Sequence, residues 1–309
     1  MRRVNVAVIA GIMLVWGSVP AMATLKPVMV VGGSGEQYWP SSNGTYLAWT
    51  NSAHNRLNVY VMELPSGTGD RVNALGTRAA AASFVGSSNV LVYAQWTAGS
   101  PGDIYFYDVS TGTRTRAPAA VNKPRTFEWA PAASANYLLF VRDKWSDAGK
   151  LLKRWLLLYD RNSAEMTTLG TGVSSRYLPS FAGTTYAAWT VVAPSGNTVH
   201  YWSAAGGKQL QPSVPGRDQY SPWIDETTGQ VYYVRARPLV CGRSVTIRRS
   251  MLGSSESTVL ASLPPTIDVG WNLSVAANFV TKAQTLYFER WSCEAETGDI
   301  YAIAGVDTI

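Results

Sequence analysis

The chain repeats one short apolar run, which ends in an aromatic residue, six times between residues 46 and 288. A second strand-like run follows each of them, as in Asn58–Tyr60 and Asp103–Tyr105, and several of these lead into a tight turn. Successive terminal aromatic residues are 44, 47, 49, 44 and 55 positions apart. Such runs between frequent turns are typical of β-strands. The six runs are Tyr46–Trp49, Val90–Tyr93, Tyr137–Phe140, Tyr186–Trp189, Val231–Tyr233 and Thr285–Phe288.

This repeat length predicts the fold class. Repeats of 45 to 50 residues with several strands each match the four-stranded antiparallel blades of a β-propeller, so six repeats predict an all-β, six-bladed ring. The sixth repeat ends at Ile309, just after its third strand. The apolar stretch Val28–Val31 precedes the first blade and is the candidate for its missing fourth strand. We therefore expect the N-terminal strand to close the ring.

The first 23 residues have the pattern of a signal peptide. Arg2 and Arg3 precede an apolar run, and Ala21-Met-Ala23 fits a cleavage site. We expect residues 24–309 to form a single propeller domain that is exported to a periplasm or the extracellular space. No other segment approaches 18 apolar residues, so no stable membrane span is expected after cleavage.

Charge and cysteine content refine this picture. The formal net charge of +6 falls to +4 without Arg2 and Arg3, which does not indicate a nucleic-acid partner. In an oxidising compartment the two cysteines, Cys241 and Cys293, predict a disulfide between long loops of the last two blades. Closing a loop of about 50 residues would contribute about 4 kcal/mol. The alternative is two unrelated small apolar side chains.

Six short segments carry a family resemblance: Tyr38–Ser41, Asn43-Gly44, Tyr46–Trp49, Asp103–Asp108, Tyr177–Ser180 and Tyr220–Pro222. Together they resemble the TolB-like family of six-bladed propellers, whose repeats are WD40-like. The resemblance runs from about Glu36 to Ile309 and implies the propeller fold. The chain departs from the family in two features. The nearest version of the family's usual Ser-Pro-Asp-Gly turn is Ser41-Ser-Asn-Gly44. TolB proteins also carry an N-terminal α/β domain, for which too few residues precede the first blade. The role in the Tol system does not follow.

Loop length selects one face of the ring for function. We call the face where the innermost strands begin the entry face, and the face where they end the exit face. Entry-face connections are long, as at 142–154, 235–244 and 290–298, whereas the exit face has short turns. Charged and aromatic residues lead into each innermost strand. The candidate ligand-binding residues are Tyr38, Trp39, Arg125, Trp129, Arg176, Tyr177, Arg217, Tyr220 and Trp271.

These residues have two interpretations. Arginines beside aromatic walls can hold a carboxylate or phosphate while stacking on flat groups. Alternatively, the arginines pair with carboxylates between blades and the aromatic residues fill the core. The long loops add basic residues to the entry face, which fit either a solvated hairpin or an anionic partner. The candidate ion-pair partners are Glu36, Glu128, Asp218 and Asp268, and the basic loop residues are Lys144, Lys150, Lys153, Arg154, Arg235, Arg237 and Arg243.

Three functions remain open. We expect a non-enzymatic binding module or scaffold of the cell envelope that holds a protein, a peptide or an anionic glycan at the channel mouth. A carbohydrate-active or other small-substrate enzyme that uses two of the channel carboxylates is the alternative, and a passive propeller is the third. His54 and His200 are the only histidines and lie far apart in sequence, so we assign no catalytic residue, metal or cofactor.

Overall fold

The computed structural model describes residues 28–32, 35–53, 56–64, 67–236, 245–263, 267–277, 284–292 and 297–304. It gives only the backbone for Val28, residues 267–277, Trp291, Ser292 and Thr297. Each of the first three blades is a four-stranded antiparallel sheet ordered from the centre outward. Their strands are β2 (Gln37–Ser42), β3 (Tyr46–Asn51), β4 (Asn58–Glu63) and β5 (Asp70–Arg71); β6 (Arg78–Phe84), β7 (Val90–Trp96), β8 (Asp103–Asp108) and β9 (Thr113–Arg116); and β10 (Phe127–Ala133), β11 (Tyr137–Trp145), β12 (Leu151–Asp160) and β13 (Met166–Thr171).

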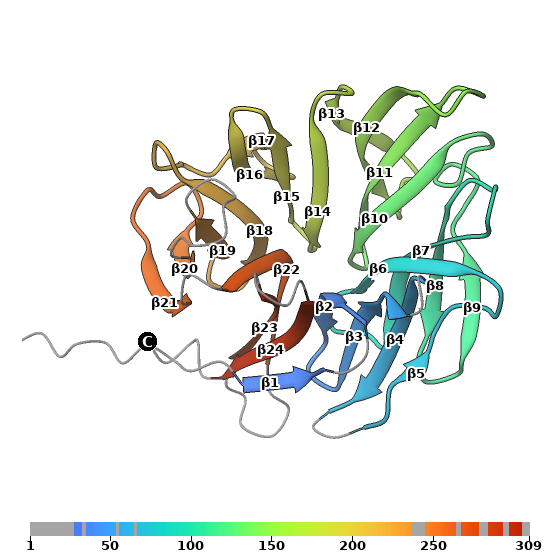
Figure 1. The fold of residues 1–309 in the computed structure, drawn as a ribbon. Coiled ribbons are helices and arrows are strands. Elements are labelled where there is room, and N and C mark those ends of the chain that lie inside the picture. The colour runs from blue at the N-terminus through green and yellow to red at the C-terminus, as the bar shows by residue number, and fades with distance from the viewer. Residues whose placement is uncertain are drawn as a thin grey trace, which may run out of the picture.

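The last three blades complete a ring, with one strand of each nearest the centre (Figure 1). The predicted six-bladed all-β propeller is thus confirmed. The strands are β14 (Arg176–Ala182), β15 (Tyr186–Ala193), β16 (Gly196–Ser203) and β17 (Gly207–Leu210); β18 (Asp218–Asp225), β19 (Gln230–Ala236), β20 (Val245–Met251) and β21 (Thr258–Leu263); and β22 (Ile267–Ala277), β23 (Gln284–Ser292) and β24 (Thr297–Ala304), followed by β1 (Val28–Val31).

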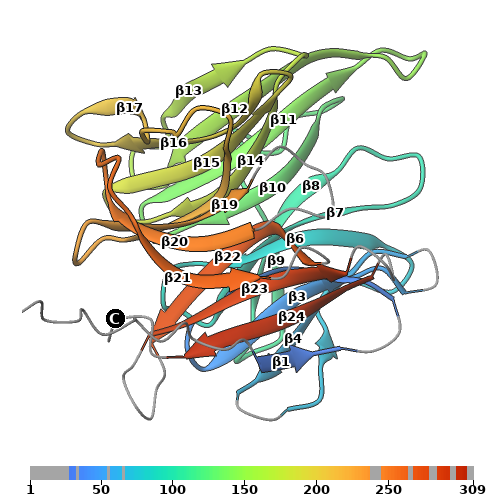
Figure 2. The ribbon, with the colours of Figure 1, turned by 60° about the vertical axis from the view of Figure 1, so that its left-hand side comes forward.

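The N-terminal strand closes the ring, as the sequence predicts. β1 pairs antiparallel with β24, with Met29 opposite Tyr301, and becomes the outer strand of the sixth blade. Figure 2 shows β1 beside β24, although the two are far apart in sequence. This pairing covers the edge of β24 and joins the last blade to the first segment of the chain.

The core consists of layers between blades rather than one central cluster. Alternate residues of each strand face opposite neighbours, so fully buried side chains such as Trp189, Phe140 and Phe288 each belong to the layer on one side of their blade. Each blade therefore buries its two faces against its neighbours, which explains why the repeats are stable only as a ring.

A bulge interrupts every innermost strand at about its middle. In four of them one residue there has a positive φ, near +50°, which non-glycine residues rarely adopt. Buried threonines of the preceding blade hold two of these bulges. The Thr50 hydroxyl accepts a hydrogen bond from Ala81 N at 3.1 Å, and Thr190 accepts one from Ser221 N at 2.9 Å.

Candidate functional site

A cleft of about 390 Å³ opens on the entry face between the third and fourth blades. It contains two of the predicted site residues, one from β10 and the other at the start of β14. The remaining walls come from Phe127 of β10 and from the hairpin of β11 and β12. The lining residues are Phe127, Trp129, Asp143, Trp145, Arg154 and Arg176.

The long hairpin explains why these side chains converge. The connection expected at 142–154 is mostly strand: β11 runs on to Trp145, β12 begins at Leu151, and Asp143 lies opposite Arg154. Residues two apart on a strand face the same side, which places Asp143 and Trp145 on the side that holds Trp129. The 142–154 segment is therefore part of a long β-hairpin, and one side of it forms a wall of the cleft.

Trp129 is the central element of the cleft. Its indole N–H donates to Asp143 Oδ2 at 3.1 Å, which fixes the ring. Arg154 donates from Nε and Nη2 to the two Asp143 oxygens at 2.7 Å each. The Cζ atoms of Arg154 and Arg176 lie 5.4 and 5.7 Å from the centre of a Trp129 ring, within cation–π range.

The charges of the cleft leave one cation without a counter-charge. Asp143 is 2% exposed and is already bound by Arg154, whereas Arg176 is exposed and makes no ion pair or side-chain hydrogen bond with a described residue. The side chain as a whole is exposed, but its guanidinium is partly desolvated beside Trp129; this desolvation and the nearby charge of Arg154 both lower the pKa of Arg176, and Asp143 opposes them. The three charged groups sum to +1, so the cleft attracts anions.

The other two predicted arginines also make no ion pair within the described part of the chain. Arg125 is exposed and precedes β10 in a positive-φ conformation, and Arg217 is half-buried before β18. The proposed ion-pair partner Glu128 contacts Arg142 instead, with 2.6 Å between Nε and Oε1. Asp218 accepts a hydrogen bond from Asn197 N. Among the described side chains, Glu128 and Asp218 therefore do not pair with Arg125, Arg176 or Arg217 between blades.

The predicted aromatic residues fall into two groups. Tyr177 and Tyr220 are 6% and 1% exposed and belong to core layers between blades. Tyr38 and Trp39 are half-buried and pack edge to face at 5.1 Å. Burial raises the pKa of Tyr38 to about 12, so its hydroxyl stays protonated at neutral pH. The side chain of Trp271 in β22 is outside the described residues, as are His54 and the predicted cysteine pair.

The channel carboxylates do not form an acid–base pair where the structure describes them. Burial raises the pKa of Glu128, against hydrogen bonds from Thr126 and Arg142 that lower it. Its neighbours are therefore a hydroxyl and a guanidinium rather than a second carboxylate. Across the described residues, no group of three or more His, Cys, Asp or Glu side chains has the arrangement of a metal site.

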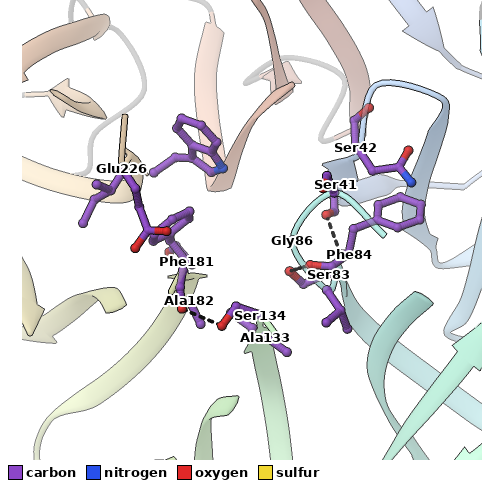
Figure 3. Close-up of a pocket in the computed structure, with 18 of the residues that line it drawn as sticks. Ser41, Ser42, Ser83, Phe84, Gly86, Ala133, Ser134, Phe181, Ala182 and Glu226 are labelled. Carbon is purple, nitrogen blue, oxygen red and sulfur yellow. Dashed lines mark hydrogen bonds between the residues drawn. The ribbon is translucent and has the colours of Figure 1, made fainter. Parts of the chain in front are cut away.

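A larger hollow of about 680 Å³ lies at the exit face. It is formed where the innermost strands end, and residues from all six blades contribute to it. Figure 3 shows Ser41, Ser83, Ser134, Phe181 and Glu226 around this common opening. The bulges of the innermost strands lie between this hollow and the entry-face arginines. The two sites therefore occupy opposite ends of the innermost strands.

Sequence reasoning missed Asp143 and Trp145 of the entry-face cleft and the whole exit-face hollow. It names Arg154 only as a basic residue of an entry-face loop. The available signal is strand geometry: 143 and 145 face the same side of one strand, and Asp143 lies opposite Arg154 on the next. For the hollow, the available signal was the recurrence of small residues and proline where the innermost strands end, as in Pro40-Ser-Ser42 and Pro131-Ala-Ala133.

Comparison with known proteins identifies the fold. No family model and no curated protein matches the chain. A structure described as a candidate TolB from Agrobacterium tumefaciens aligns with a TM-score of 0.55 at 12% identity, over 87% of this chain and 89% of that one. TolB from Acinetobacter baumannii aligns at 0.51 and 12%, over 89% and 65%. An oligogalacturonate lyase in complex with manganese aligns at 0.51 and 12%, over 90% and 81%.

These identities show a common fold and nothing finer. The expected likeness to TolB-like propellers is confirmed at that level. Because a lyase shares the same architecture, the fold alone does not separate binding from catalysis. No helix among the described residues is long and apolar enough to cross a bilayer.

Proposed function

We propose that the protein is an exported, non-enzymatic binding module of the cell envelope, which holds an acidic segment of a protein or peptide, or an anionic glycan, on its entry face. One observation carries this proposal: Arg176 lies on Trp129 at the cleft and has no acidic partner among the residues that the structure describes. The signal-peptide pattern of residues 1–23 supports export.

The cleft suits a ligand that combines negative charge with a flat or apolar group. A carboxylate can accept hydrogen bonds from Arg176 and from Arg154 Nη1, because Arg154 uses only Nε and Nη2 to hold Asp143. The rings of Phe127 and Trp145 offer apolar surface beside these donors, and Trp145 is 47% exposed. Acidic peptides with aromatic residues and uronate-containing glycans both present this chemistry.

The binding hypothesis is tested with defined anionic probes. We would measure the Kd of a fluorescent Asp- and Glu-rich peptide containing one Trp, and of a short oligouronate, by anisotropy or calorimetry at two salt concentrations. Loss of one charge-assisted hydrogen-bond partner predicts about tenfold weaker binding for Arg176→Ala. Lys208→Ala is the charge-matched control, because Lys208 is exposed and lies on β17, away from the cleft.

The two variants separate specific binding from general charge attraction. A specific site predicts that Lys208→Ala binds like the wild type, while Arg176→Ala loses affinity and part of its salt dependence. Equal affinities for both variants would show that the cleft does not hold the anion. Tight binding of an uncharged peptide of the same length would show that charge is not the basis of recognition.

A further inference from the structure

The exit-face hollow is large enough to hold a ligand of its own. Its volume of about 680 Å³ falls within the range of small-molecule sites. Its walls are mostly small side chains, including Ser83, Ala132 and Ser180, so little of the space is filled from the strands themselves. Because six blades contribute, the hollow is a rigid feature of the assembled ring rather than of one loop.

The sign of the charge in the hollow is opposite to that of the entry-face cleft. Asp225 and Glu226 are the only charged side chains among its described lining residues. Burial opposes ionisation of both, but hydrogen bonds from Gln284 and the 227–228 backbone outweigh it at Asp225, and those from Thr184 and Thr185 outweigh it at Glu226. The pKa of each is lowered, so both stay ionised at neutral pH. Concave walls concentrate this negative potential.

Both carboxylates are held in place by the protein. Glu226 accepts five hydrogen bonds from residues 184 to 186, at 2.7 to 2.9 Å. Asp225 Oδ2 accepts one from Gln284, whose own oxygen accepts one from Tyr232. Their oxygens are largely occupied, so they act on a ligand through their field, and the direct contacts must come from other lining groups.

Aromatic and hydroxyl groups supply those contacts. Trp223 packs edge to face on Phe181 with centroids 5.4 Å apart, and it makes no side-chain hydrogen bond with a described residue. The hydroxyls of Ser83 and Ser180 each make one long bond, of 3.4 and 3.3 Å, to a carbonyl of their own strand. A cation can therefore lie against an aromatic face while the hydroxyls bind polar groups of the same ligand.

We propose that this hollow is a second ligand site and that it takes a small molecule carrying a protonated amine on a body of monosaccharide or amino-acid size. The hollow sets the size, the two fixed carboxylates select positive charge, and Trp223 with the two serines provides the contact surface. The inference does not depend on the proposed anion site, because the two sites share no lining residue.

The test compares amines with an uncharged derivative. Glucosamine and lysine amide represent an amino-sugar and an amino-acid source, and N-acetylglucosamine is the neutral counterpart of the first. Saturation-transfer NMR followed by calorimetry, at low salt, should show binding of at least one of the two amines and none of the acetylated sugar. Loss of one carboxylate charge in Asp225→Asn should weaken amine binding about fivefold.

Filling the hollow gives an independent arm. Ser180→Phe should abolish amine binding, whereas Ser110→Phe, on an exposed outer turn, should leave it unchanged. If circular dichroism and Tm show that Ser180→Phe does not fold, the affinity of Asp225→Asn for the amines still tests the proposal. Three results would overturn the proposal: equal binding of glucosamine and its acetylated form, no saturation transfer from either amine at millimolar concentration, or wild-type binding by a folded Ser180→Phe.

Discussion

The hydrogen bond between Thr50 and the next blade allows a quantitative test of how the ring is held together. Thr50 is 0% exposed, and its hydroxyl accepts from the N–H of Ala81, which is 6% exposed and has a φ of 57°. Thr50→Val keeps the shape of the side chain but removes the acceptor. The Ala81 N–H is then left buried, at a backbone conformation that already costs energy.

The expected loss is about 1–3 kcal/mol, the cost of leaving a buried donor without an acceptor. For a domain of this size that corresponds to a Tm about 2–5 °C lower. Thr168→Val is the matched control, because Thr168 is exposed on β13 and makes no side-chain hydrogen bond with a described residue, so its effect should stay within about 0.5 kcal/mol.

Two measurements check the prediction. Urea unfolding gives the change in free energy, and amide hydrogen exchange reports directly on the Ala81 N–H, which should exchange faster in Thr50→Val. The reasoning fails if Thr50→Val and Thr168→Val have the same stability and Ala81 exchanges at the wild-type rate. Thr190 makes the equivalent hydrogen bond, from Ser221 N, between the fourth and fifth blades, and Thr190→Val should behave in the same way.

Two further predictions concern a half-buried histidine, His200, and the closing strand. Burial, with a contribution from Lys208, lowers the pKa of His200 to about 4. The unfolded state binds this proton more readily, so the free energy of unfolding should fall as the pH drops from about 6.5 to 4, by at most about 3 kcal/mol. His200→Gln should remove this part of the pH dependence. An NMR titration that gives an unshifted pKa for His200 would refute the prediction. Deleting the chain through Val31 should expose the edge of β24 and cause self-association, visible in light scattering; a deletion variant that stays monomeric with an unchanged Tm would count against the closing role of β1.

The fold was accessible from sequence because it depends on a repeat. Apolar runs such as Tyr46–Trp49 recur at blade spacing, and Val28–Val31 was left without a partner, so both the number of blades and the closure could be predicted. These features depend on local strand patterns and on counting. They need no knowledge of which side chains meet across blades.

The candidate site was only partly accessible, because it depends on which side of a strand each residue faces. Arg176 and Trp129 were selected as members of a ring, and they do meet. Tyr177 and Tyr220 were selected by the same pattern, yet they pack in inter-blade layers. A charged residue followed by an aromatic one marks the start of an innermost strand. It does not show which neighbouring blade the aromatic side chain faces, because a bulge shifts the register of each innermost strand.

The bulge in β10 shows how one strand can serve both ends of the molecule. Before the bulge, Phe127 and Trp129 line the anion-attracting cleft on the entry face. After it, residues 131 to 133 line the negatively charged hollow on the exit face. The φ of 48° at Ala130 lies between these two halves, so the backbone changes direction where the two sites separate.

Because each bulge bends its strand at the same level of the ring, a change at one end should reach the other only by displacing a bulge. Two bulges are each held by a buried threonine of the preceding blade. The two sites should therefore bind their ligands independently in the wild type. In Thr50→Val, which loosens one bulge, binding at one site should begin to affect binding at the other.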